Sequence, residues 1–370
     1  MSPSSIIKRG SGTEPAKPSS AERAKDGREA SSRPLRVVAI GGGTGLSTLL
    51  RGLKKYAAHS STVDLPASST TGDLPPVGDL TAVVTVTDDG GSSGRLRKEF
   101  NILPPGDIRN CLVALSEDEA LLSRIFQYRF ETGGGLEGHN FGNLFVTALT
   151  AVTGDFAEAV RESSKILATR GTIFPSTVSN VQLEALMNDG STVFGETKIT
   201  ASRLRIVRLR MVPENAKPLP ETLEAISKAD LITIGPGSLF TSLIPNLLVH
   251  GIPEAIAASK ARKVYVCNLM TQANESLGLT ASDHIRKLYE HAGAPIFDYA
   301  VVNTAPISES LQAKYALEGA SRIVVDRERI EALGVRCLTG NFVDEGNVVR
   351  HATDRVAAEL LALAVNPRSS

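Results

Sequence analysis

Apolar residues follow two alternating patterns along most of the chain. Short apolar runs, which are typical of buried strands, occupy residues 35–40, 80–86, 231–234, 263–270, 299–303 and 322–326. Apolar residues at helical spacing occur between them, most clearly over residues 46–53, 112–126, 141–152 and 156–167. Strands that alternate with helices form parallel sheets. The pattern therefore predicts an α/β fold with a doubly wound, mainly parallel sheet, whose ligands bind beyond the carboxyl ends of its strands.

Three segments depart from this pattern. Residues 1–33 mix Ser, Pro, Lys, Arg, Glu and Ala with few large apolar residues, which predicts a disordered tail. Residues 59–79 are rich in Ser, Thr, Pro, Gly and Asp and predict a surface loop inserted between a helix and a strand. Residues 173–212 favour short strands, with a turn at Asn188-Asp189-Gly190, and predict a small β-rich insertion. We expect one domain over residues 34–366.

Composition excludes several classes of protein. The 40 basic and 40 acidic side chains cancel, which disfavours nucleic acid as the main ligand. A chain of 370 residues that is 42% hydrophobic can bury a large core. Its three cysteines lie far apart, which predicts neither a zinc finger nor a disulfide framework. No apolar run approaches the roughly 18 residues of a membrane span, and no signal peptide is evident. We expect a soluble cytoplasmic protein with no membrane span.

A glycine run after the first predicted strand is the first candidate site. Residues without Cβ let backbone N–H groups approach a phosphate at the start of the following helix. The match to a dinucleotide fingerprint is incomplete, because Leu46 stands where the third glycine would be. No Lys-Ser or Lys-Thr pair follows, so this is not a Walker A loop. A tight turn without a ligand is the alternative. The candidate phosphate-binding residues are Gly41, Gly42, Gly43, Thr44 and Gly45.

A second polar loop follows the second predicted strand, where a nucleotide-binding fold places the acid that holds a ribose hydroxyl. Two adjacent acids could instead bind a divalent metal, and the Gly-Ser stretch ending in Arg95 could bind an anion. A solvated hairpin tip is the remaining alternative. The candidates in this loop are Asp88, Asp89, Ser92, Ser93 and Arg95.

Two further segments carry polar residues before helices. Asp107 is suited either to cap the helix that it begins or to face the same cleft. The glycine-rich loop of residues 133–143 places His139, Asn140 and Asn143 before an apolar helix. These three side chains could contact a base, a sugar or a carboxylate, and a helix cap within a mobile loop is the alternative.

The strand at residues 231–234 leads into a second glycine turn and helix start. Its candidate phosphate-binding residues are Gly235, Gly237 and Ser238. Two such loops in one sheet suggest a ligand with more than one phosphate, or with a polar group at each end. The histidines lack the spacing of zinc ligands.

Together these loops resemble the family of gluconeogenesis factors often called YvcK, in the superfamily that also contains the 2-phospho-L-lactate transferases. The resemblance covers about residues 34–364, and its most specific pieces are residues 41–50, 84–97, 104–115, 139–149 and 234–246. It implies a Rossmann-like three-layer core and a cytoplasmic bacterial protein that acts in carbon partitioning and cell shape during gluconeogenic growth. It also implies binding of UDP-N-acetylglucosamine or a related nucleotide.

Two principal functions are compatible with this resemblance. In the first, a non-catalytic regulatory protein senses a nucleotide sugar, with the glycine loops on its phosphates and Asp88 or Asp89 on its ribose. In the second, Asp88 and Asp89 hold Mg²⁺ in a transferase of the 2-phospho-L-lactate type. The transferase branch carries a Ser-Pro-Asp-Leu-Asp stretch that this chain lacks, which favours the regulatory protein. For a third class, a nicotinamide-dependent oxidoreductase, no partner for hydride transfer can be named.

The segment before the last predicted helix, residues 355–365, completes the set of candidates. The resemblance implies a ligand contact at Arg350 and a phosphorylation site at Thr353, and therefore a protein kinase as partner. Thr353 is also a plausible N-cap of that helix, and the alternative is a surface arginine beside a capping threonine. A homo-oligomer is a further expectation for this protein.

Overall fold

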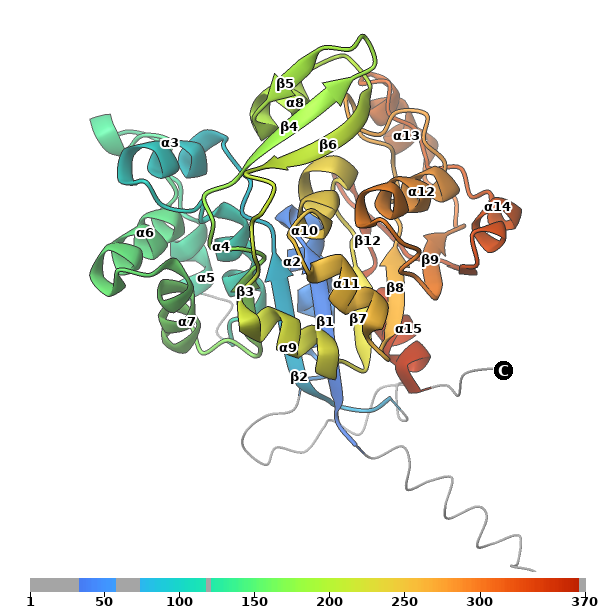
Figure 1. The fold of residues 1–370 in the computed structure, drawn as a ribbon, viewed down its shortest axis with the longest axis horizontal. Coiled ribbons are helices and arrows are strands. Elements are labelled where there is room, and N and C mark those ends of the chain that lie inside the picture. The colour runs from blue at the N-terminus through green and yellow to red at the C-terminus, as the bar shows by residue number, and fades with distance from the viewer. Residues whose placement is uncertain (1–32, 58–73, 118–120, 366–370) are drawn as a thin grey trace, which may run out of the picture. The chain divides into compact units, whose positions relative to one another are not determined.

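The main element of the fold is a seven-stranded parallel sheet in strand order β10-β9-β8-β7-β1-β2-β3 (Figure 1). The computed structural model describes residues 33–57, 74–117 and 121–365, so the expected tail and most of the expected inserted loop lie outside the described residues. The strands are β1 (Leu35–Gly41), β2 (Val77–Val84), β3 (Thr172–Pro175), β7 (Leu231–Ile234), β8 (Arg262–Val266), β9 (Tyr299–Asn303) and β10 (Arg336–Gly340). The predicted α/β class is confirmed.

The order of the strands reverses between β1 and β7. From β1 the chain moves outward to β2 and β3, then returns to the other side of β1 and moves outward through β7, β8, β9 and β10. At such a switch point the two neighbouring connections leave on opposite faces of the sheet and open a crevice at the carboxyl ends of the strands. Both glycine loops of the sequence follow these two strands, so the topology brings them to one crevice.

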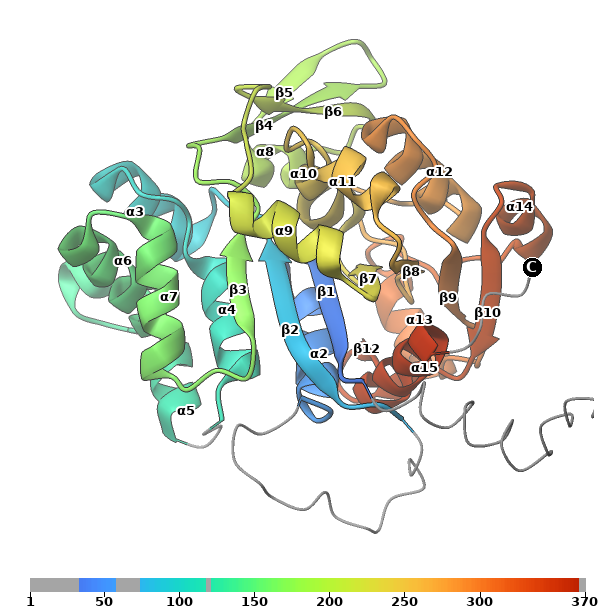
Figure 2. The same ribbon diagram turned by 60° about the horizontal axis from the view of Figure 1, so that its bottom comes forward.

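Helices cover both faces of the sheet (Figures 1 and 2). One face carries α2 (Gly43–Lys54), α4 (Gly106–Leu115) and α15 (Thr353–Val365), and the other carries α9 (Pro220–Lys228), α10 (Ile244–Leu247), α11 (Ile252–Ala258) and α12 (Ala281–Ala292). Further helices are α3 (Gly91–Phe100), α5 (Leu121–Gln127), α6 (Phe141–Thr153), α7 (Phe156–Ile166), α13 (Glu309–Ala316) and α14 (Arg327–Ala332), the last of which packs against β10 and α12. Apolar residues of β1, such as Ile40, are fully buried between the layers. Burial of both faces explains why these strands are continuously apolar.

A second, antiparallel sheet forms the small β-rich part. Its order is β5-β4-β6, with β4 (Gln182–Met187), β5 (Thr192–Phe194) and β6 (Ile206–Val212). The short helix α8 (Glu196–Ala201) connects β5 to β6. The turn at Asn188-Asp189-Gly190 joins β4 to β5, as predicted. Ile173, however, lies in β3 of the main sheet, because Thr172–Pro175 pairs with β2 rather than with the small sheet.

The structure differs from the sequence pattern at three places. Strand β2 begins at Val77, so residues 77–79 belong to the sheet and not to the inserted loop. The helical pattern of residues 112–126 divides into α4 and α5. The apolar run of residues 322–326 is not a strand of the sheet, and β10 takes the edge position next to β9. Val324 in that run is 62% exposed, which shows that apolar composition alone does not place a segment in a sheet.

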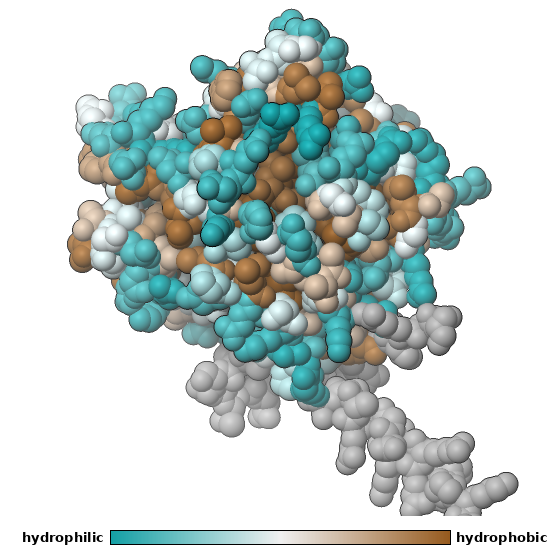
Figure 3. All heavy atoms as spheres, viewed as in Figure 1, coloured by the Kyte–Doolittle hydropathy of each residue, from teal (hydrophilic) through white to brown (hydrophobic). Residues whose placement is uncertain are grey.

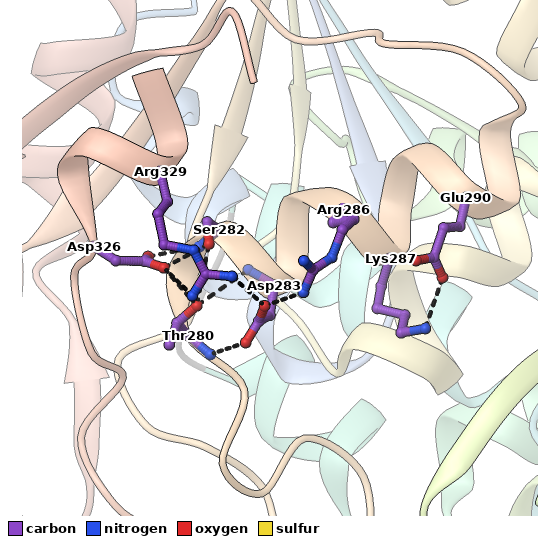
Figure 4. Close-up of polar contacts among 8 residues, drawn as sticks. All are labelled: Thr280, Ser282, Asp283, Arg286, Lys287, Glu290, Asp326 and Arg329. Atoms are coloured by element: carbon purple, nitrogen blue, oxygen red, sulfur yellow. Dashed lines mark hydrogen bonds and ion pairs between the residues drawn. The ribbon is translucent and has the colours of Figure 1, made fainter. Parts of the chain in front are cut away.

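The end of that run has a different structural role (Figure 4). Thr280 caps α12 in a capping box with Asp283. Asp326 accepts hydrogen bonds from the Ser282 amide at 2.9 Å and from the Thr280 hydroxyl at 2.8 Å. Arg329 lies near both carboxylates, 3.4 Å from Asp326 and 3.6 Å from Asp283. The 322–326 segment therefore stabilises the start of a helix instead of extending the sheet.

The surface and the helix lengths bear on the expectation of no membrane span. Polar residues cover much of the face in Figure 3, and apolar residues lie between them. Among residues 33–57, 74–117 and 121–365, no single helix is long and apolar enough to cross a membrane. One bent pair, Leu239–Leu247 with Ile252–Ala258, meets that test by length and composition alone.

Candidate functional site

A cavity of about 540 Å³ lies at the switch point of the sheet. Its volume is within the range of small-molecule sites in proteins. The first glycine loop contributes Gly42, Gly43, Thr44 and Gly45 to its lining, and the second contributes Gly237 and Ser238. The structure therefore brings the two predicted phosphate-binding loops together on one cavity. Gly41 and Gly235, at the ends of the strands, are not among the lining residues.

Glycine is needed at different positions of the first loop for different structural reasons. Gly43 has φ of 62°, a conformation that favours glycine, and it faces open space near Ser242. A Cβ on Gly45 would lie 2.3 Å from the carbonyl oxygen of Pro236, so glycine is needed there for the close approach of the two loops. The Gly43 amide donates to Asp107, whereas Thr44 and Gly45 are placed where helix N-terminal amides have no intrahelical acceptor. These two amides remain suited to bind an anion.

The second loop is held by side chains of its own chain. Asn268 accepts from the Gly237 amide at 3.1 Å and donates to the Gly237 carbonyl at 2.7 Å. The Glu275 carboxylate accepts from the amides of Phe240 and Thr241 at 2.9 and 2.8 Å, at the start of η2 (Leu239–Leu243), a turn of π-helix. An internal carboxylate thus occupies the position expected for a phosphate. The part of this loop that can contact a ligand is therefore Ser238, whose hydroxyl accepts a hydrogen bond from the Gln272 side chain at 2.9 Å.

Three carboxyl groups line the same cavity. They belong to Asp88, Asp107 and Glu196, the last from α8 of the small sheet. Burial raises the pKa of Asp107 to about 6, and the Gly43 amide opposes this rise. Burial, together with repulsion from Asp88 and Asp107, raises the pKa of Glu196 to about 9. Glu196 is therefore protonated at neutral pH, whereas most of Asp107 is ionised.

No lysine or arginine is among the residues that line the cavity in the described part of the chain. The lining also includes four apolar or aromatic residues, Leu269, Met270, Tyr315 and Val349. These residues belong to or pack against a small separate core that includes Ile307 and Leu311. The lining therefore combines amides, hydroxyls and carboxyls with an apolar group that includes an aromatic ring.

His351 lies on the β11–β12 hairpin, formed by β11 (Val343–Glu345) and β12 (Val349–His351), and lines the cavity. Its Nε2 donates to the carbonyl oxygen of Cys267 at 3.0 Å, because a carbonyl can only accept. Burial lowers the pKa of His351 to about 4, so the ring is neutral at pH 7. With Nε2 protonated, Nδ1 of the neutral ring is an acceptor.

Several predicted site residues do not line this cavity. Asp89 accepts from the amide and hydroxyl of Thr197 instead. Arg95 donates to the carbonyl of Glu137. His139, Asn140 and Asn143 are buried around the hydroxyl of Ser92, and Asn143 also reaches Ser93. These residues join α3 to the start of α6, and Asn140 caps α6 through the Asn143 amide. Asn140 is therefore a helix cap, as in the alternative, while His139 and Asn143 form hydrogen bonds to α3.

The C-terminal candidates are placed beside the cavity rather than in its wall. Arg350 lies between Val349 and His351, and successive residues of a strand face opposite sides, so its exposed side chain lies on the other face of the hairpin. Thr353 is the first helical residue of α15, and its hydroxyl donates to the His351 carbonyl at 3.4 Å. Thr353 therefore does not cap α15 as predicted, because the helix begins one residue earlier than an N-cap there would require.

Sequence reasoning missed several lining or supporting residues: Glu196, Asn268, Gln272, Glu275, Tyr315 and His351. A signal existed for Asn268 and Gln272, because polar residues after a buried parallel strand mark the carboxyl edge of the sheet. No local signal marks Glu196 or Tyr315, which reach the cavity from the small sheet and from α13.

The fold defines a doubly wound α/β protein with a cavity at the switch point of its sheet. The chain belongs to the CofD family, since the family model described as 2-phospho-L-lactate transferase CofD matches residues 37–343. It is similar to the gluconeogenesis factor of Halalkalibacterium halodurans, with 50% identity over 88% of this chain and 95% of that protein. The gluconeogenesis factor of Bacillus subtilis is 46% identical over 89% of this chain and 98% of that protein.

A solved structure has the same fold. The crystal structure of a UPF0052 family protein from Bacillus halodurans superimposes with a TM-score of 0.81 and 49% sequence identity, covering 89% of this chain and 99% of that chain. The resemblance found in the sequence is confirmed, and the matches support a general role as a gluconeogenesis factor.

Proposed function

We propose that this protein is a cytoplasmic regulator that binds a nucleotide sugar, UDP-N-acetylglucosamine or a close relative, and acts in carbon partitioning and cell morphogenesis during gluconeogenic growth. The observation that carries the proposal is that one cavity combines two glycine loops with an apolar group of lining residues that includes an aromatic ring. Thr44, Gly45 and Ser238 would bind the phosphates. Tyr315 and Met270 would contact the base, because aromatic and apolar side chains bury a flat ring well.

The acidic lining sets a condition on phosphate binding. The carboxyl groups of Asp88 and Asp107 disfavour a diphosphate beside them, and no Lys or Arg side chain in the described lining offsets this effect. Either a proton or a cation must therefore accompany the ligand. Among the described residues, no group of three acidic, histidine or cysteine side chains is arranged to hold a metal ion. Mg²⁺ commonly binds through one or two carboxylates together with phosphate oxygens and water, which fits Asp88 and Asp107.

This acidic lining also supports the second candidate, a Mg²⁺-dependent transferase of the 2-phospho-L-lactate type. In that function the ion would neutralise the negative charge that builds up on the leaving phosphate as the acceptor hydroxyl attacks. The metal pair would then be Asp88 with Asp107, and not Asp88 with Asp89, because Asp89 is bound to Thr197 outside the cavity. The regulatory function needs only binding, whereas the transferase needs turnover.

Thermal unfolding with added ligand tests the proposal. UDP-N-acetylglucosamine at 100 times its Kd should stabilise the native protein by about 2.7 kcal/mol, and GDP, NAD and phosphoenolpyruvate should stabilise it less. Each ligand is tested with and without Mg²⁺. Cleavage of the nucleotide is followed separately by chromatography. No stabilisation by any nucleotide would contradict the proposed binding, and Mg²⁺-dependent cleavage would favour the transferase.

The adjacent acids offer a matched pair of variants. Asp88→Asn changes a carboxylate in the cavity wall, and Asp89→Asn makes the same change one residue away, outside the wall. We expect only Asp88→Asn to alter ligand affinity and its dependence on Mg²⁺. Equal effects of the two variants would mean that the cavity is not the binding site.

A further inference from the structure

A second cavity, of about 660 Å³, lies between α3 and the small antiparallel sheet. Its charge is opposite to that of the first cavity. Arg97, Lys98 and Lys198 line it, with Asp89 as the one acidic lining residue among those described. The carboxylate of Asp89 accepts two hydrogen bonds from Thr197, at 2.8 Å from the amide and 2.6 Å from the hydroxyl. The three cationic groups therefore outnumber the one carboxylate, which already has partners.

Arg97 is the buried cation of this cavity. Arg97 is only 7% exposed, and burial lowers the pKa of its guanidinium group. Nε and Nη2 donate to the side-chain oxygen of Asn180, and Nη2 also donates to the Val181 carbonyl. Nη1 is buried and has no hydrogen-bond partner among the described residues. A buried charged donor without a partner is costly, so the arrangement favours an additional acceptor.

The two lysines come from opposite walls. Lys98 lies on α3 and Lys198 on α8, and neither forms an ion pair with another described residue. Asn101, at the end of α3, and Gln182, on β4, add polar side chains to the lining. Two mobile cations and one fixed guanidinium group are the side chains that proteins use to bind a compact dianion.

The same cavity has an apolar side. Phe194 is 50% exposed and Val212 is 40% exposed, and both line the cavity together with Pro213. An exposed aromatic ring on a strand edge buries area when a flat apolar group stacks on it. An anion-binding side and an apolar side within one cavity indicate an organic anion rather than an inorganic ion.

We propose that this basic cavity is a second ligand site, which binds a small phosphate monoester whose organic part contacts Phe194. The site is distinct from the first cavity, and helix α8 is shared by both. Glu196 lines the first cavity, whereas its neighbours Gly195 and Lys198 line the second. A ligand that orders Lys198 therefore acts on the same turn of helix that carries Glu196.

Titration calorimetry with simple probes tests this site. The probes are phenyl phosphate, inorganic phosphate and benzoate, which separate the contributions of the dianion and of the ring. We expect phenyl phosphate to bind more tightly than either of the others. The variant Lys98→Glu/Lys198→Glu should weaken phenyl phosphate binding by about tenfold or more, the scale of one lost charge-assisted contact.

The control is a double charge reversal outside the cavity. Lys165→Glu/Lys228→Glu changes two exposed lysines of α7 and α9, and it should leave the affinity for phenyl phosphate unchanged. Circular dichroism establishes that both variants are folded. Equal affinity of the wild type and the Lys98→Glu/Lys198→Glu variant would overturn the site. Equal affinity for phenyl phosphate and inorganic phosphate would overturn the assigned contact with Phe194.

Discussion

Folding changes the pKa of the Glu196 carboxyl group strongly. Its pKa is about 9 in the folded protein, because burial and the nearby Asp88 and Asp107 disfavour its ionised form. In the unfolded chain the same group has its ordinary pKa near 4.5. Below pH 4.5 both states hold the proton, and as the pH rises towards 9 only the folded state keeps it. Stability is therefore progressively lost between these pH values.

This pH dependence predicts the behaviour of Glu196→Gln. The amide resembles the protonated acid and does not ionise, so the stability of the variant relative to the wild type should rise steadily from pH 5 to pH 8.5. We expect a gap in Tm of at least about 2–4 °C at pH 8.5, the shift that ~1 kcal/mol produces in a large domain. Thermal unfolding from pH 5 to 9 measures the gap. Glu254→Gln, at an exposed position on α11, is the control and should show no such trend. A constant difference at all pH values would contradict the assignment.

Arg350 carries a prediction of its own at the edge of the first cavity. The described lining has no Lys or Arg, while Arg350 is an exposed cation between two lining residues, Val349 and His351. We expect the Arg350 side chain to turn from the outer face of the hairpin to a bound diphosphate, so that Arg350→Ala weakens UDP-N-acetylglucosamine binding by about tenfold. Arg124→Ala on α5 is a control of equal charge. Calorimetric affinities that are the same for wild type and Arg350→Ala would remove Arg350 from the site.

Single residues were the least predictable part of the site. The sequence could not distinguish Asp88 from Asp89, because the direction of each side chain depends on the backbone at the end of β2. It likewise favoured Arg350, although the alternation of β12 places His351 in the cavity wall. Glu196 could not be assigned to the site at all, because it is 108 residues from Asp88 along the chain and joins it only through the packing of the small sheet.

At the scale of elements, the start of α15 carries a prediction about regulation. Thr353 is the first residue of the helix, and Lys55 pairs with the neighbouring Asp354 at 2.7 Å. Arg51 and Arg355 line the same surface cavity as Thr353. A negative group on Thr353 would therefore lie at the positive end of a helix and among cations.

We expect the phosphate mimic Thr353→Glu to stabilise the fold modestly. A favourable charge at a helix start contributes about 0.3–1 kcal/mol at low ionic strength, and salt screens it. At 20 mM salt, thermal unfolding should give a higher Tm for Thr353→Glu than for the uncharged Thr353→Gln. Raising the salt concentration to about 0.5 M should reduce this difference in Tm. A protein kinase as partner stays a prediction, which mass spectrometry of the protein from its own cells can test. A lower Tm for Thr353→Glu at low salt would contradict the stabilising role.

Elements with continuous apolar runs were predicted well, but their first and last residues were not. β1, β7 and β9 are buried on both faces, so their composition alone marks them. β10 has exposed or half-exposed residues at four of its five positions and resembles a surface segment in sequence. The run at residues 322–326 is more apolar, yet its acid Asp326 binds the start of α12 and holds it away from the sheet.

For the whole molecule, alternation of strands and helices was enough to predict the class of fold and the side of the sheet that binds ligands. Parallel strands require crossover connections, and a reversal of strand order creates a crevice between the first strands of each half. Two glycine loops at the ends of β1 and β7 therefore had to meet once the strand order was fixed. The strand order itself was not evident from the pattern, because the inner strands β1, β7 and β9 are similarly apolar and nothing in their sequences marks which strands are neighbours.

The last prediction concerns the N-terminal segment. Residues 1–33 carry Ile6 and Ile7 as their only large aliphatic residues apart from Met1, too few to offset the entropy of ordering a segment of this length. The central strand β1 begins at Leu35, so the deletion stops short of the sheet. Removal of residues 1–33 should leave Tm and the affinity for UDP-N-acetylglucosamine nearly unchanged, as measured by calorimetry. A deletion of residues 1–37 is the contrasting variant, because it removes Val37 from the core and should lower Tm sharply. If the shorter deletion lowered Tm by as much as the longer one, the segment would contribute to the folded core.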